Sequence, residues 1–143
     1  MKNIFLRIYR NQNSSAGALI LRIVLGVLFI TAGWMKVTQI DMIVGFFAQA
    51  GYTSFQAHLV AWTELIGGVL VLVGFLNKPA TVALSVIMAV VVFGGYPDQD
   101  YNIFWGNNYE FMILTGLMAL YFVGPGKYSI GHWILSRRRS QQN

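Results

Sequence analysis

Four charged side chains fall within, or at the edges of, long apolar stretches of this sequence: Arg22, Lys36, Glu64 and Glu110. A charge at the centre of a bilayer costs about 2.5–3.5 kcal/mol on insertion scales, so such groups usually face a partner or a wet cavity. The two cations and two anions would balance one another. We therefore expect a buried salt-bridge network that fixes helix order, or a polar cavity that binds a small head group or carries protons. Snorkelling of these side chains to the membrane surface is a third interpretation.

The first apolar stretch carries its charges on one face of a helix. Arg22, Gly26, Phe29, Gly33 and Lys36 are spaced alternately by four and three residues, which places them along a single stripe. A stripe of cations and glycines on an otherwise apolar helix indicates a surface that packs against other helices.

Glu64 lies on a second stripe of this kind, together with Gly67 and Gly74. Small residues beside the carboxylate would let the first and second helices approach closely. Glu64 is the deepest of the carboxylates, which makes it the first candidate for a functional residue.

The depth of each charge along its helix limits which pairs can form. At a rise of 1.5 Å per residue, Lys36 lies near the same membrane face as Glu64 and Glu110, so we expect it to pair with one of them. Arg22 would have to stretch toward Glu64 or snorkel to the cytoplasmic head groups.

The composition indicates that membrane helices position these residues. The chain has 143 residues, of which 56% are hydrophobic and 10% charged, against roughly 25% charged residues in soluble domains. A domain of this size has too little volume to bury so much apolar surface. Its main partner is therefore predicted to be the lipid bilayer. The net charge of +5 follows from membrane topology and does not indicate binding to nucleic acid.

Hydropathy predicts an all-α integral membrane protein with four transmembrane helices in an antiparallel bundle. The first span is close to the roughly 20 residues that a bilayer core requires. The expected spans are residues 16–36, 57–76, 80–95 and 109–124. They form a transmembrane domain of residues 16–130, between a basic arm of residues 1–15 and a basic tail of residues 131–143.

The segment between the first two spans is too polar to cross a membrane. Phe46 and Phe47 would form the apolar side of a short interfacial helix that ends at Gly51. Thr53 or Ser54 would then cap the next helix.

Basic residues gather on one side of the predicted bundle. This side holds Lys2, Arg7, Arg10, Lys78, Lys127 and Arg137 to Arg139. The opposite loops hold Asp41, Asp98 and Asp100. The positive-inside rule places both termini in the cytoplasm, as in a multi-pass protein of a bacterial inner membrane. The aromatic residues of the loop 94–108 would form an interfacial belt or a lid over a ligand.

The sequence holds little that would make a self-contained enzyme. There is no cysteine, and therefore no thiol nucleophile or thiolate ligand. No group of histidines and acids has the spacing of a metal site, and no glycine-rich stretch has the context of a phosphate loop. We expect no metal site.

Several short motifs follow one another in a definite order. They are Leu21-Arg22-Ile23 with Gly26, Phe29, Ala32-Gly33 and Lys36, then Glu64-Leu65-Ile66-Gly67-Gly68 running to Leu72-Val73-Gly74-Phe75, then Glu110, then Gly124-Pro125-Gly126-Lys127-Tyr128-Ser129-Ile130. Together they resemble the DoxX family of small membrane proteins over residues 18–130. One departure is Gly131, which stands where the family usually has an aspartate.

The resemblance implies a four-helix inner-membrane protein with Arg22, Lys36, Glu64 and Glu110 as its site residues. Some relatives are associated with redox systems, including the membrane part of thiosulfate–quinone oxidoreductases. The resemblance therefore favours a membrane subunit or anchor of a redox system, accessory to a quinone-linked oxidoreductase, with quinone or another lipid held in the charged seam. Its partners would be a soluble oxidoreductase, other redox subunits or further copies of the chain.

Two alternatives remain open at the level of sequence. The first is a small proton-coupled transporter or exporter that uses Glu64, although the sequence has no clear internal repeat and no broken helix. The second is a structural membrane protein without its own activity.

Overall fold

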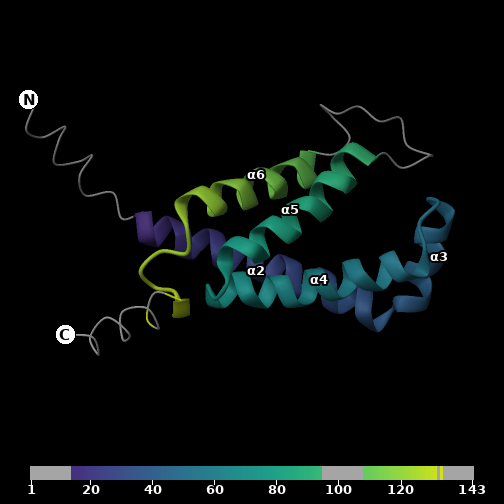
Figure 1. Cartoon of the computed structure of the whole chain (residues 1–143), viewed down its shortest axis with the longest axis horizontal. Helices are drawn as coiled ribbons and strands as arrows, with labels where there is room; N and C mark the ends of the chain where they lie inside the picture. The colour runs from purple at the N-terminus through teal and green to yellow at the C-terminus, as the bar shows by residue number, and fades with distance from the viewer. Residues whose placement is uncertain (1–13, 95–107, 132, 134–143) are drawn as a thin grey trace, which may run out of the picture.

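The computed structural model describes residues 14–94, 108–131 and 133, which form five helices. They are α2 (Ser14–Thr38), α3 (Ile40–Gln49), α4 (Ser54–Val73), α5 (Asn77–Gly94) and α6 (Asn108–Val123). The start of α2 and the end of α6 lie at one end of the molecule, and α3 lies at the other (Figure 1). The predicted all-helical fold is confirmed. Most of the basic arm, the aromatic loop and most of the basic tail lie outside the described residues.

Two of the helices are long and apolar enough to cross a membrane. These are α2 and α4, whose most apolar windows have mean hydropathies of 2.2 and 1.5, whereas α3, α5 and α6 are shorter apolar helices. Only 33% of the residues in these two windows are buried inside the chain. Large apolar side chains that face outward from α2 and α4 include Ile20, Val24, Trp34, Leu59, Trp62 and Ile66. An apolar exterior of this extent suits contact with lipid.

The contact between α2 and α4 is the most extensive in the described structure. It is close because glycines occupy the crossing: a Cβ atom on Gly26 would lie 2.7 Å from the Cβ of Leu72, and one on Gly68 would lie 2.8 Å from the backbone nitrogen of Ile30. A Cβ on Gly33 would overlap the backbone of Leu65. The close approach that the glycine stripes predict is therefore present.

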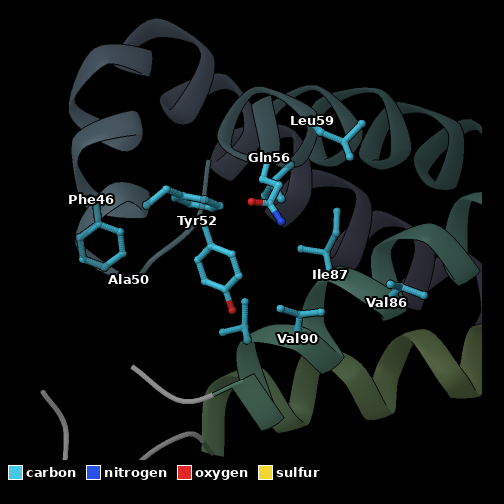
Figure 2. Close-up of a pocket in the computed structure, with 11 residues that line it drawn as sticks. Phe46, Ala50, Tyr52, Gln56, Leu59, Val86, Ile87 and Val90 are labelled. Carbon is cyan, nitrogen blue, oxygen red and sulfur yellow. The ribbon is translucent and has the colours of Figure 1, made fainter. Parts of the chain in front are cut away.

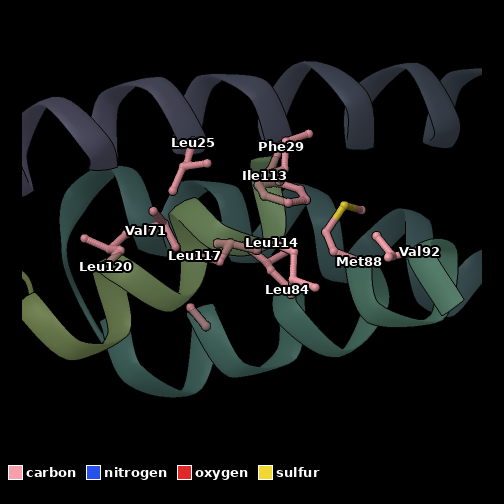
Figure 3. Packing of buried hydrophobic residues seen from close by; sticks show 11 residues of the cluster. Leu25, Phe29, Val71, Leu84, Met88, Val92, Ile113, Leu114, Leu117 and Leu120 are labelled. Carbon is pink, nitrogen blue, oxygen red and sulfur yellow. The ribbon is translucent and has the colours of Figure 1, made fainter. Parts of the chain in front are cut away.

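A cluster of buried apolar side chains joins α2, α4, α5 and α6 (Figure 3). Its members are Leu25, Phe29, Val71, Ala80, Leu84, Met88, Val92, Ile113, Leu114, Leu117 and Leu120. Leu25 and Phe29 point into it from α2. The cluster sets the positions of α5 and α6 against the α2–α4 pair.

The boundary between α4 and α5 differs from the expected one. Gly74 adopts a left-handed conformation with a φ of 69°, and it ends α4 before residue 76. The Phe75 N–H donates to the Leu70 carbonyl and the Gly74 N–H to the Val71 carbonyl, each at 3.1 Å, as in a Schellman cap. Helix α5 then begins at Asn77 instead of residue 80, because Pro79 is accommodated in its first turn.

The short helix expected between the first two spans is present as α3. The Gly51 φ of 80° lets the chain turn after it. Thr53 caps α4, since its hydroxyl accepts a hydrogen bond from the Gln56 N–H while the Gln56 side chain accepts one from the Thr53 N–H. This reciprocal pair of bonds is a capping box.

Candidate functional site

The centre of the candidate site is an ion pair between Lys36 on α2 and Glu64 on α4. The Glu64 side chain is 2% exposed and the Lys36 side chain 22% exposed, so the carboxylate is buried while the ammonium group reaches a more open region. The pair forms because antiparallel packing of α2 and α4 brings the end of one helix beside the middle of the other. It is one of the two pairings that depth along the helices allows.

A cavity of about 430 Å³ lies beside this ion pair. Its walls come from all five described helices and are mostly apolar. The residues that line it include Phe29, Ala32, Lys36, Phe47, Val60, Glu64, Met88, Val91, Tyr109, Glu110 and Ile113. A wall of this kind, apolar with a few convergent polar groups, is typical of a small-molecule site.

Glu110, on the first turn of α6, lines the same cavity as Lys36 and Glu64. Among the described residues it forms no ion pair. Three of the four charges predicted from the sequence therefore surround one cavity, with two carboxylates and one ammonium group.

Arg22 lies elsewhere, and its partners within the described part of the chain are backbone carbonyls. Its Nε donates to Val71 at 3.1 Å and its Nη2 to Leu72 at 2.7 Å, both near the end of α4. Its Nη1 donates to Pro125 at 3.0 Å and to Tyr128 at 3.1 Å, in the segment after α6. The residue is 2% exposed, so these four carbonyls take the place of water around the guanidinium group.

The expectation that Arg22 stretches toward Glu64 or snorkels is therefore wrong. Arg22 and Lys36 are fourteen residues apart on one helix, which corresponds to about 21 Å along its axis. The four carbonyl partners of Arg22 could not be predicted from the sequence, because they belong to a helix end and a turn that are far apart in the chain. Gly74 is the signal in the sequence that points to these carbonyl partners. A helix that ends at this glycine leaves its last carbonyls without partners in the helix.

A second, apolar cavity of about 210 Å³ lies between α3, α4 and α5 (Figure 2). It is lined by Phe46, Phe47, Ala50, Tyr52, Gln56, Leu59, Val60, Val86, Ile87, Val90 and Val91. The sequence predicts the apolar side of α3 but not the cavity. The side of the cavity that α5 lines depends on the packing of that helix.

The charged cavity offers an ammonium donor to a carbonyl-bearing head group. An ammonium group offers three N–H donors, and a carboxylate accepts hydrogen bonds. Lys36 could therefore donate to a ligand while Glu64 holds the Lys36 ammonium group in place. Removal from bulk water strengthens such contacts.

Comparison with known proteins gives a family and several relatives. The sequence model of the DoxX family matches residues 17–96, a range that includes Arg22, Lys36 and Glu64 but not Glu110. "Putative oxidoreductase CatD" of Bacillus subtilis is 31% identical over 116 residues, which cover 81% of this chain and 84% of that protein.

Two further relatives are described as membrane proteins. "Inner membrane protein YqjF" of Escherichia coli is 31% identical over 117 residues, covering 80% of this chain and 88% of the relative. "Uncharacterized membrane protein Rv3486" of Mycobacterium tuberculosis is 30% identical over 138 residues, covering 85% and 80%. No solved structure gives a significant match.

Proposed function

Because this chain belongs to the DoxX family of membrane proteins, we propose that it is a membrane subunit or anchor of a quinone-linked redox system. A quinone head group would bind beside Lys36 and Glu64. The observation that carries this proposal is the buried ion pair on the wall of the 430 Å³ cavity. The name of the Bacillus subtilis relative, a putative oxidoreductase, supports a redox role.

The topology that we propose has four spans, α2, α4, α5 and α6, with both termini in the cytoplasm of a bacterial cell. α5 has 18 residues and α6 has 16, which gives lengths of about 27 and 24 Å, near the lower limit for a bilayer core. The sequence concentrates lysine and arginine in the two terminal segments and in the turn between α4 and α5, which supports this orientation.

The cavity has the chemistry that a quinone requires. Its apolar walls suit the ring, and the Lys36 ammonium group is a donor for a carbonyl oxygen. When bound, a quinone would accept two electrons and two protons. A soluble oxidoreductase would supply the electrons, while this chain holds the acceptor in the membrane.

The charged residues around the cavity would have different roles in binding the quinone head group. Lys36 Nζ would donate to the carbonyl oxygen, and Glu64 would fix the direction of that ammonium group through their ion pair. Glu110 would offer a second carboxylate at the cavity wall, where it could hold a proton. Arg22 has no part in this role, because its donors already bind four backbone carbonyls.

Native mass spectrometry of the protein, gently extracted from its own membrane, tests this proposal. We expect a retained quinone that is lost in Glu64→Gln and kept in Thr115→Val, a matched variant whose hydroxyl donates to Phe111 within its own helix and which does not line the charged cavity. Removing the charge partner of Lys36 should weaken binding about tenfold or more, because a charged hydrogen bond contributes about 1.5–3 kcal/mol. Retention of the quinone in Glu64→Gln would contradict the site.

A proton-coupled transporter is the rival function, and a carboxylate that faces an internal cavity is the observation that favours it. It predicts a substrate flux into proteoliposomes that depends on Glu64 and needs no redox partner. Absence of any retained quinone, together with such a flux, would replace our proposal with this one.

A further inference from the structure

The apolar cavity beside α3 adjoins the charged cavity. Phe47 of α3, Val60 of α4 and Val91 of α5 line both of them. The Phe47 ring also contacts the ring of Tyr52, with centroids 5.8 Å apart, and Tyr52 lines the apolar cavity. One set of apolar side chains therefore separates a charged compartment from an apolar one.

The apolar cavity contains little that could bind a polar ligand. Its polar side chains are Tyr52 and Gln56, and the Gln56 carbonyl already accepts hydrogen bonds from Thr53 at 2.8 and 3.0 Å. The remaining walls are aliphatic or aromatic (Figure 2).

The outer rim of this cavity lies on the exterior of the helices. Phe46, Leu59, Val86 and Val90 line it and are 49%, 54%, 59% and 48% exposed. In a membrane these apolar residues would face the lipid chains. The cavity therefore opens sideways toward lipid at one end and borders the charged compartment at the other, across the side chains that line both.

We propose that the apolar cavity is the passage for the isoprenoid tail of the ligand whose head group binds beside Lys36 and Glu64. This inference rests on the proposed function and adds the ligand class: a head group with one long tail, which leaves sideways between α3, α4 and α5. Tail binding would contribute little affinity, because lipid chains are as apolar as the cavity wall. The passage instead lets a long-tailed molecule place its head group inside the bundle.

The passage gives α3 a role. It supplies the Phe46, Phe47 and Ala50 side of the passage, and it is held in place by the turn at Gly51 and the capping box at the start of α4. A wall made by a short helix between two spans can exclude tails that are too bulky.

The test measures quinone binding to the full chain in lipid nanodiscs, by native mass spectrometry. The two probes are menaquinone with its full isoprenoid tail and menadione, which has the same ring system without a tail. Val90→Trp and Leu59→Trp narrow the passage from different helices. Val82→Trp is the matched control, because Val82 is also an exposed valine of α5, 47% exposed, but does not line either cavity.

We expect both narrowing variants to lose binding of menaquinone by about tenfold or more, since the added indole ring takes the space of the tail. Menadione binding should change less than about twofold in the same samples, and Val82→Trp should bind both probes like the unaltered chain. The preserved menadione binding also shows that the variants are folded.

Other outcomes overturn the inference in distinguishable ways. Unchanged menaquinone binding in both narrowing variants would contradict the proposed passage but not the proposed head-group site. Equal loss of menaquinone and menadione in both variants also contradicts a passage for the tail. Failure of the unaltered chain to bind either probe overturns the proposed function and this inference together.

Discussion

The two cations of α2 find their partners in different ways. Lys36 pairs with a carboxylate beside a cavity, whereas Arg22 binds carbonyls at helix ends and turns. The flat guanidinium group of arginine can bind several acceptors at once, while the ammonium group of lysine behaves as a compact point charge. In this chain the arginine joins helix ends and turns, whereas the lysine lines a cavity.

Lys36→Met should destabilise the chain more than Lys36→Met combined with Glu64→Leu. The single variant leaves a buried carboxylate without its partner, which costs about 3–5 kcal/mol, whereas replacing a buried pair by apolar residues is often neutral. The measurement is the free energy of unfolding in detergent micelles, with Thr31→Val as a control that should change it by less than about 0.5 kcal/mol. A double variant as unstable as the single one would contradict a buried ion pair.

At the level of helices, the glycines of α2 and α4 decide how close the two helices lie. Gly68 contacts the backbone of α2 directly, whereas a Cβ on Gly45, in α3, would meet no atom within 4 Å. The same substitution at these two positions should therefore have opposite effects.

We expect Gly68→Ala to lower the free energy of unfolding by about 1–3 kcal/mol, because the added methyl group forces α2 and α4 apart. Gly45→Ala should raise it by about 0.5–1 kcal/mol, since alanine in a helix loses less conformational entropy than glycine. Thermal unfolding of both variants under one set of conditions measures the difference. Equal effects of the two changes would show that the close crossing is absent in solution.

Helices were easier to predict from the sequence than their ends and partners. The long apolar stretches fix where α2, α4, α5 and α6 lie, and Gly51 and Thr53 mark the turn before α4. The apolar pattern continues past Gly74 and predicts an end at residue 76, whereas the left-handed conformation of that glycine ends α4 at Val73.

The candidate site could be predicted only in part. Depth along the helices limits Lys36 to two partners, and the structure selects Glu64. The walls of the two cavities depend on the rotation of α5 and α6, which apolar patterns on nearly uniform helices do not determine. For the same reason the carbonyl partners of Arg22 could not be found by pairing charges.

At the scale of the whole molecule, the proposed orientation places the turn between α4 and α5 in the cytoplasm and α3 on the opposite side. Because the sequence contains no cysteine, single cysteines can report this orientation without background labelling. Gln49, Lys78 and Lys127 are exposed and suit this purpose.

In cells with a permeabilised outer membrane, a membrane-impermeant maleimide should label Gln49→Cys. It should label Lys78→Cys and Lys127→Cys only after the inner membrane is disrupted. The physical reason is the retention of basic loops on the cytoplasmic side during insertion. The reverse pattern of labelling would overturn the proposed topology.

The contacts of Arg22 also have a consequence for how the protein is made. Its Nη1 binds carbonyls that lie 103 and 106 residues later in the chain. While the ribosome is still producing α5 and α6, the arginine has only its two acceptors in α4. In a chain that stops before Pro125, the guanidinium group in the first apolar helix lacks two of its acceptors. The segment after α6 therefore supplies the last two acceptors of the Arg22 guanidinium group. Unfinished chains lack these two hydrogen bonds, and finished chains have them.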